Sequence, residues 1–563
     1  MRKLALRCGY EANGQDLAAK FRDDYTRRTD ENKEIINRLL HEMFAEDLPS
    51  DPVDDLVLDH NPSSELIQQV LSPYGFRDPT DAYHSLNALA VEKMPFLSTR
   101  RCRHFLSLIA KPLLESIAKT PGPDATLANL CRVSDSIGGK GVLWELFHTN
   151  APSLDLYVRI CSSSPYLISI LTRYPGMIDE LLDSLLLADL PTLGELQTEL
   201  DELCSKVEDI EPVLHSFKNT QHLNVGVREL LGKADISEST ATLADVAESC
   251  LQHIAQDQHQ KLVRKYGQPS VDGGKKPCEM IILAMGKFGG REPNYHSDVG
   301  VMFTFEADGQ TQHPPTIRNR ETTTNQHFHS ELGQRIVKKL SDNTPHGRLY
   351  DSDDRLRPLG EFGPNAVSLD EFQRHQLSGV HSFASLRRLC QARPVYGSEP
   401  MRAKAREILQ EILTTATVAD LDSDSIKRER HRIQESAGPR NLKRGPGGTV
   451  DIEFIVQALQ LKNASLKPGI LKPNTLDALV ALHEHEVINS EDAGFLSDSY
   501  RFLRRVEARL RLLNTTARHD LPREGDELAK LAYLLQYDAS SSLESECAQY
   551  AKRNRKLFDK LIA

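Results

Sequence analysis

The stretch AMGKFGGREPNYHSDVGVMF, residues Ala284–Phe303, decides the fold class of this chain. An apolar run enters a glycine-rich turn, and a second apolar run begins after a polar loop. Cys278–Gly286 (CEMIILAMG) and Val299–Glu306 (VGVMFTFE) have the length and the residue types of buried strands. Two such strands around a glycine-rich turn predict a small α/β domain.

The surrounding sequence is mainly helical. His329–Asp342 is expected to form an amphipathic helix, and Gly347–Pro358 (GRLYDSDDRLRP) to begin as a third strand. Apolar residues recur at helical spacing in Ser164–Leu186, where Pro175 and Gly176 separate two helices, and in Tyr500–Leu513. The sequence therefore predicts a mostly α protein with one α/β domain and helical bundles on both sides.

The change of pattern near Cys278 and the return to helix by Met401 place the α/β domain at about Cys278 to Gly397. Near the start, KLALRCGYEA (Lys3–Ala12) resembles KLAYLLQYDA (Lys530–Ala539), which suggests that the chain opens with the end of an earlier, related unit. The predicted parts are a remnant of that unit (1–46), a linker (47–99), a helical domain (100–270), the α/β domain (276–410) and a C-terminal helical bundle (425–563).

Composition narrows the functional class. The chain has 563 residues, enough for two to four domains, with 39% hydrophobic and 26% charged residues. It contains no apolar run of the roughly 18 residues that a membrane helix needs. Nine cysteines without a CxxC pair favour a reducing, cytoplasmic location over disulfides or a zinc site. The formal charge of -11 does not favour nucleic acid as a partner.

The chemistry is expected at the glycine-rich turn. Nucleotidyl transfer requires a held triphosphate and acidic residues that carry divalent metal. Asp298 follows Ser297 at the mouth of the second strand, and Asp353 on the presumed third strand can face the same point. Groups suited to phosphate are Gly286, Lys287, Gly289, Gly290, Arg355 and Arg357. Turn glycines and solvated charges are the alternative interpretation, and the residue types alone leave both open.

Three further motifs were weighed. Lys443 and Arg444 precede GPGGT, for which a structural turn is the expected role, while the two basic residues are expected to face nucleotide or a partner. Thr449 is predicted to cap the helix that follows. The paired histidines of Asn325–Ser330 and Leu482–Glu486 lack the spacing of a zinc site. The arginines of Tyr500–Leu513 are interpreted as a solvated face, with contact to an acidic partner as the alternative.

Five motifs together resemble the family of bifunctional glutamine synthetase adenylyltransferase/adenylyl-removing enzymes. They are GKFGGREPNYHSD (286–298), YDSDDRLRPLGEFG (350–363), QARPVYGS (391–398), KRGPGGTVDIEF (443–454) and YRFLRRVEARLRLL (500–513). The resemblance covers nearly the whole chain and corresponds to the C-terminal half of the family. It implies a DNA polymerase β-like nucleotidyltransferase fold, transfer of AMP from ATP to a tyrosine of glutamine synthetase, Mg2+, and the PII signal protein as a second partner.

Matched motif by motif, Asp298 and Asp353 take the positions of the first and third metal-binding acids of the family. The second acid corresponds to Gly300, and a Trp-Glu pair of the family corresponds to Ala384 and Ser385. These departures set two hypotheses side by side. One is an adenylyltransferase in which Asp298 and Asp353 hold Mg2+, the glycine-rich turn, Lys287 and Arg355 hold phosphate, and Ser297, Arg357, Lys443 and Arg444 contribute to nucleotide binding. The other is a catalytically impaired regulatory module that binds nucleotide, PII or glutamine synthetase.

Overall fold

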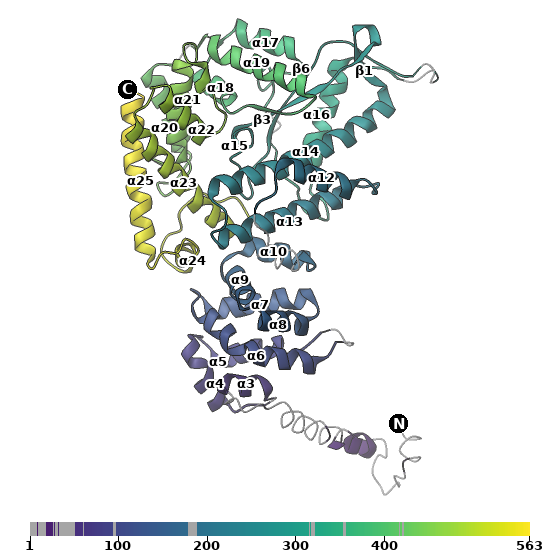
Figure 1. Ribbon diagram of the computed structural model, residues 1–563, viewed down its shortest axis with the longest axis vertical. Coiled ribbons are helices and arrows are strands. Elements are labelled where there is room, and N and C mark those ends of the chain that lie inside the picture. The colour runs from purple at the N-terminus through teal and green to yellow at the C-terminus, as the bar shows by residue number, and fades with distance from the viewer. Residues whose placement is uncertain are drawn as a thin grey trace.

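The computed structural model describes residues 51–563 except 60, 94–96, 178–188, 315, 317–320, 353–355, 416 and 419–420, and a few residues before 51 (8, 19–25, 27, 28 and 32). The described chain is mostly helical and contains one α/β domain, so the predicted fold class is confirmed. Figure 1 shows helices α3–α9 at one end of an elongated molecule, the sheet toward the other end, and the C-terminal helices along one side.

The first helices run consecutively along the chain. They are α3 (Pro52–Leu58), α4 (Ser64–Leu71), α5 (Pro79–Leu89), α6 (Thr99–Ala118), α7 (Pro123–Ile137), α8 (Lys140–Thr149), α9 (Ala151–Ser163), α10 (Pro165–Arg173), α12 (Leu193–Cys204), α13 (Glu211–Leu230) and α14 (Ile236–Tyr266). Residues 47–99, expected to be a linker, hold three of these helices. Pro52 and Pro79 each open a helix, where the missing N–H costs nothing.

Helix α10 lies just before the predicted break at Pro175–Gly176. Helix α10 ends at Arg173, as that break requires, while the second predicted helix falls on residues 178–188, outside the described residues. The predicted remnant unit, 1–46, also lies almost entirely outside them and stays a prediction.

The α/β domain is built on a four-stranded sheet in the order β6-β4-β3-β8. The strands are β3 (Met280–Met285), β4 (Gly300–Phe305), β6 (Ala366–Ser368) and β8 (Arg393–Tyr396). Strand β3 pairs antiparallel with β4 and β8, and β4 pairs parallel with β6. Both predicted strands are thus confirmed, as is the predicted helix, which is α16 (Asn325–Ser341).

Smaller elements surround this sheet. They are β1 (Gln268–Val271), β2 (Lys276–Pro277), β5 (Gln310–Gln312), β7 (Val380–His381) and β9 (Thr417–Val418), with helices α15 (Gly286–Gly289), α17 (Leu369–Ser378), α18 (Phe383–Leu389) and α19 (Glu399–Thr415). Strands β2, β1 and β5 form a separate three-stranded sheet. Strand β1 begins at Gln268, inside the range that the sequence assigned to the preceding helical domain.

The sheet is covered on both faces, which explains why its strands are apolar throughout. Side chains of β3 alternate between two cores: Ile281 and Leu283 pack with the C-terminal helices, while Ile282 and Ala284 pack with α12–α14 and α16. Because alternate residues of a strand share a face, Gly300 is on the same side of β4 as Met302, which packs with the C-terminal helices.

The predicted third strand is wrong. Residues 347–352 and 356–358, the described parts of Gly347–Pro358, form no strand, and β6 and β8 are the real neighbours of the central hairpin. The segment is attached by isolated backbone hydrogen bonds instead. Tyr350 N–H donates to Leu340 O (2.9 Å), and Val299 N–H donates to Asp351 O (2.7 Å). Charged residues without β-branched side chains have a low propensity for strands, so these hydrogen bonds do not continue as a ladder.

The C-terminal bundle consists of α20 (Ser423–Glu435), α21 (Thr449–Asn463), α22 (Thr475–Glu484), α23 (Ser490–Leu512), α24 (Asp526–Leu534) and α25 (Ser540–Leu561). In Figure 1 these helices lie beside α18 and the sheet. No helix among the described residues is both long and apolar enough to cross a membrane.

The KRGPGGT loop is folded around one buried carboxylate, that of Asp451 in α21. Asp451 accepts from the guanidinium of Arg430, from Gly447 N–H (2.9 Å) and, as an ion pair, from Arg555 (3.1 Å). Arg430 also donates to the carbonyl of Gly445 (2.8 Å). The expected structural role of this turn agrees with these contacts. Thr449 is the first residue of α21 rather than its cap, because the N-cap is Gly448.

Replacing Gly447 by alanine should destabilise the protein by about 2–3 kcal/mol. A Cβ at this position would lie 1.9 Å from Ala551 O, and the φ of +72° strains any other residue. The measurement is the free energy of unfolding by denaturant. Gly494→Ala is the matched control, since its Cβ meets nothing within 4 Å and the residue lies in α23, where alanine should stabilise slightly. Equal stability of the two variants would contradict the packing described here.

Candidate functional site

The glycine-rich turn joins β3 to the loop that carries Asp298. Gly286 has a φ of +56° and open space where a Cβ would be. A Cβ on Gly289 would lie 1.9 Å from Gln391 O, and one on Gly290 would lie 2.9 Å from Pro473 O. Glycine is therefore required at 289 and 290 by close backbone approaches. A phosphate-binding role for Gly286, Gly289 and Gly290 stays a prediction.

Lys287 is directed into a buried polar cluster. Its ammonium forms ion pairs with Glu453 (2.7 Å) and Glu292 (3.1 Å) and donates to the hydroxyl of Tyr500. Burial alone would lower the pKa of Lys287, but the charges of Glu453, Tyr500 and Glu292 outweigh it and raise that pKa above its ordinary value. The lysine expected at phosphate is thus engaged in joining the turn to α21 and α23.

The buried carboxylate of Glu292 makes this junction rigid. It accepts from the hydroxyls of Tyr500 (2.7 Å) and Thr475 (3.1 Å) and from the backbone N–H of Thr475, besides pairing with Lys287. Asn474 donates to the carbonyl of Gly290 (2.9 Å). The turn of the α/β domain is therefore bonded to both α22 and α23.

The interpretation of the α23 arginines as a solvated face is wrong for the buried ones. Arg501 and Arg505 are exposed, but Arg504 and Arg511 are buried and both pair with Glu507. Burial alone would raise the pKa of Glu507, but Arg504 and Arg511 hold it well below its ordinary value. The buried charges of α23 are therefore paired within the protein, while Arg501 and Arg505 face solvent.

Ser297 and Asp298 lie at the edge of this cluster. The hydroxyl of Ser297 accepts from Arg511 (2.9 Å) and from Asn294 N–H (2.8 Å), so it is already committed within the loop. Asp298 is exposed. The next residue, Val299, donates to Asp351 O (2.7 Å), and its carbonyl accepts from the hydroxyl of Ser352 (2.9 Å).

These bonds bring the chain that leads to Asp353 beside Asp298. Asp353 itself, with Arg355, lies outside the described residues, and so does the distance between the two predicted acids. Glu306 is at the other end of β4, paired with Lys276 (2.5 Å), and the Asp351 carboxylate pairs with Arg348. Both carboxylates are thus already paired with a cation.

The described residues do not by themselves fit a divalent cation. Such ions prefer several carboxylate or carbonyl oxygens, and in the described part of the chain no group of three or more His, Cys, Asp or Glu could hold a metal. Asp298 is the one predicted metal ligand that can be placed. An Mg2+ site remains a prediction that depends on Asp353.

The remaining predicted basic residues differ in their surroundings. Arg357 donates to Gly363 O (2.8 Å) within its own loop. Arg444 is exposed. Burial lowers the pKa of Lys443, against the opposing charges of Glu507 and Glu453. Among the described residues no carboxylate lies within ion-pairing distance of the Lys443 ammonium, so this cation of the junction is available to a ligand.

The other candidate positions have no catalytic arrangement. Ala384 and Ser385 lie in α18, where Ser385 N–H is capped by Ser382 (3.1 Å). His327 is exposed, whereas His329 is buried against the Phe305 ring (centroids 5.0 Å apart), so the two histidines do not converge on one ion.

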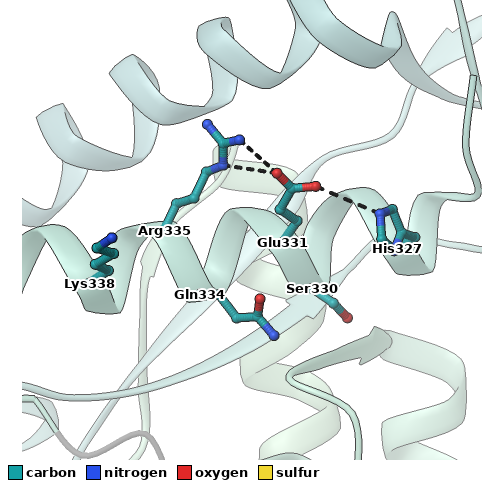
Figure 2. Close-up of a pocket in the computed structure, with 6 residues that line it drawn as sticks. All are labelled: His327, Ser330, Glu331, Gln334, Arg335 and Lys338. Atoms are coloured by element: carbon teal, nitrogen blue, oxygen red, sulfur yellow. Dashed lines mark hydrogen bonds and ion pairs between the residues drawn. The ribbon is translucent and has the colours of Figure 1, made fainter. Parts of the chain in front are cut away.

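Figure 2 shows the groove beside His327. It is lined by one face of α16: His327, Ser330, Glu331, Gln334, Arg335 and Lys338. Glu331 accepts from Arg335 (2.7 Å) and pairs with His327 (3.6 Å), and Tyr266 also donates to it (3.0 Å). The Glu331 carboxylate is therefore occupied by partners within the protein.

Sequence reasoning missed the buried acids that organise the site: Glu292, Glu453 and Glu507. A signal was present for Glu453, since TVDIEFIVQALQL has no polar stripe and a helix apolar on every side is buried. An acid in such a helix must be paired. The partner could not be identified, because it comes from a distant part of the chain.

The central hairpin, the glycine-rich turn and the acid at the mouth of β4 define a nucleotidyltransferase-like domain. Residues 154–408 match the family model of glutamate-ammonia ligase adenylyltransferase, and residues 418–562 match that of GlnD PII-uridylyltransferase. These matches confirm the resemblance to the family of glutamine synthetase adenylyltransferases that the motifs predicted.

Curated relatives support the same assignment. Proteins named bifunctional glutamine synthetase adenylyltransferase/adenylyl-removing enzyme match from Thioalkalivibrio sulfidiphilus (31% identical, covering 81% of this chain and 48% of the relative) and Shewanella oneidensis (27%, 76% and 48%). A third, from Pseudomonas aeruginosa, is 27% identical and covers 80% of this chain and 48% of the relative. The chain spans about half the length of the curated relatives it matches.

Proposed function

We propose that this chain transfers AMP from ATP to a tyrosine of glutamine synthetase. In this reaction the tyrosine oxygen forms a bond to the α-phosphorus, the bond between the α- and β-phosphates breaks, and pyrophosphate leaves. The observation that carries the proposal is the placement of Asp298 at the mouth of β4, with the segment leading to Asp353 bonded to the next residue. The names of the relatives supply the protein substrate.

The proposed roles depend on whether each side chain is already engaged within the protein. Asp298 and Asp353 are the proposed acidic residues, with Mg2+ as their ion. Lys443 is the proposed counter-charge for phosphate, since it is enclosed and lacks a carboxylate partner among the described residues. Arg355, Arg357 and Arg444 are proposed to help hold the nucleotide. Lys287 and Ser297 act instead through the structure of the turn, because both are already engaged.

Two further assignments belong to this proposal. The PII signal protein is the proposed regulator, since the C-terminal helices match a PII-uridylyltransferase family model. The cytoplasm is the proposed location, since all nine cysteines are free thiols.

A second candidate is a regulatory module that binds nucleotide or a partner protein without efficient catalysis. It is favoured by Gly300, which has no side chain where the family carries an acid, and by the engagement of Lys287 in the junction. The two candidates differ in rate rather than in fold.

The deciding experiment incubates the full chain and purified glutamine synthetase with ATP labelled at the α-phosphate. Label on glutamine synthetase, reduced at least tenfold in Asp298→Asn, supports the adenylyltransferase. ATP binding without transfer, and without change in Asp298→Asn, supports the regulatory module. The exposed Asp370, paired with Lys404 (3.3 Å), gives the control variant Asp370→Asn, which should leave transfer unchanged.

A further inference from the structure

Both segments that converge on Asp298 are held by cations that come from helices outside the α/β domain. One cation is Arg511 of α23 and the other is Lys218 of α13. We infer that Arg511 and Lys218 are positioning residues: they fix the Tyr295–Ser297 loop and the Leu349–Asp351 segment relative to each other. The inference rests on the proposed function, because that function defines which geometry matters.

Arg511 holds the loop that precedes Asp298. One nitrogen of its guanidinium donates to Tyr295 O (2.6 Å) and to the hydroxyl of Ser297 (2.9 Å), and the other donates to Glu507 (2.8 Å). A planar guanidinium with three fixed acceptors determines orientation as well as distance. His296, between the two loop contacts, has a φ of +57°, a conformation that persists only where its surroundings impose it.

The Arg511 guanidinium is itself oriented by its carboxylate partner, whose position is fixed by other donors. Glu507, its carboxylate partner, also accepts from Arg504 and from the ring of His519 (2.9 Å). His296 contributes a second tether, from its ring to Asn514 O (3.2 Å). The loop bearing Asp298 is therefore attached to α23 and to the chain just beyond it.

Lys218 holds the opposite segment. Its ammonium donates to Leu349 O and lies 4.4 Å from the centre of the Tyr350 ring. Among the described residues no carboxylate pairs with it, so its charge acts on a backbone carbonyl and an aromatic face. Burial lowers the pKa of Lys218 to about 8. The next residue, Asp351, is the one that accepts from Val299.

Among the described residues, two hydrogen bonds connect these two parts of the chain directly. These are Val299 N–H to Asp351 O (2.7 Å) and the Ser352 hydroxyl to Val299 O (2.9 Å). A catalytic constellation has to be held within about 0.5 Å of its working geometry. Loops without a ladder cannot supply that precision alone, and the two cations supply it from rigid helices.

The test for Arg511 compares two buried arginines of α23 by amide hydrogen exchange on the full chain. Arg511→Lys should speed exchange of the amides of residues 295–299 at least tenfold. Arg509→Lys is the matched control: Arg509 is also buried, and its hydrogen bonds among the described residues go to Glu229 of α13 rather than to the backbone of the loop. Unchanged exchange in Arg511→Lys, or an equal effect of both variants, overturns the inference.

The test for Lys218 uses a second matched pair. Lys218→Met should speed exchange at Val299 and Tyr350 at least tenfold. Lys265→Met is the control, since Lys265 also lies over a tyrosine ring, that of Tyr266 at 4.2 Å, but on the outer side of α14. Protection of Val299 that survives Lys218→Met would show that Lys218 does not position the segment.

Kinetics separate positioning from general stability. Arg511→Lys should lower kcat for AMP transfer at least tenfold with less than a threefold change in the KM for ATP, while Arg509→Lys should change neither. A matching loss in Arg509→Lys overturns the inference. If the wild-type chain transfers no AMP, the proposed function fails, and the exchange experiments, which require no catalysis, still decide whether the two cations position the segments.

Discussion

Gly300→Asp should raise the rate of AMP transfer to glutamine synthetase at least tenfold. Position 300 is the first residue of β4, and Asp298 precedes it by two residues at the mouth of the strand. An acid there would help to hold a divalent metal ion, whose positive charge would offset the negative charge that develops at the transferred phosphate, and one such electrostatic group is commonly worth about 3–4 kcal/mol, or 10²–10³ in rate. The wild-type chain, which lacks it, should therefore transfer AMP slowly.

The structure has room for this substitution. A Cβ at Gly300 would lie 3.1 Å from Leu356 Cδ1, 3.4 Å from Met285 O and 3.5 Å from Met285 Cβ. Only the first contact is tight, and it involves the end of a flexible side chain that can move by a few tenths of an ångström. The backbone at Gly300 is not in the left-handed region, so aspartate adds no strain there.

The matched control is Gly300→Asn, which has nearly the same shape as aspartate but no charge. Initial rates of labelled AMP transfer are measured for wild type and both variants at equal protein concentration. If asparagine raises the rate as much as aspartate, the gain comes from shape and the electrostatic argument is wrong. A wild-type rate that is already fast would mean that another acid performs the role, and the reading of Gly300 as a loss would fail.

The central hairpin could be predicted from the sequence because its information is local. The β3 and β4 runs are apolar throughout and the glycines between them mark the turn, so periodicity and turn chemistry agree. The prediction of a third strand was wrong because the real neighbouring strands have no such local signal. β6 and β8 are short, and their sequences have no strong strand pattern. The strand was expected instead at Gly347–Pro358, whose residues suit phosphate chemistry.

The roles of individual charges could not be predicted in the same way. Lys287 follows a glycine in a phosphate-type motif, but its destination depends on Tyr500, 213 residues further along the chain. The α23 arginines lie off one apolar stripe, which suggests solvent, yet Arg511 donates to Tyr295 O, 216 residues earlier. Spacing within a motif describes one element, while the burial of a charge depends on which elements meet.

Lys287→Met should lower the free energy of unfolding by about 3–5 kcal/mol, because removing one partner of a buried ion pair leaves the other charge unpaired. Glu453 is the residue most affected. Its carboxylate is 9% exposed and pairs with Lys287 at 2.7 Å, whereas Glu292 keeps Tyr500 and Thr475 as donors. Denaturant unfolding measures the loss. Lys404→Met is the control, since its pair with Asp370 is exposed and should be worth less than about 1 kcal/mol.

The double variant Lys287→Met/Glu453→Gln distinguishes a structural lysine from a phosphate-binding one. Neutralising Glu453 removes the unpaired charge, so the double variant should recover at least half of the stability lost in Lys287→Met. ATP affinity, measured on the double variant by calorimetry, should then stay within threefold of wild type. If the double variant recovers its stability but no longer binds ATP, Lys287 takes part in nucleotide binding. The contacts among the turn, α21 and α23 would then be intact, so the loss of binding would come from the missing ammonium.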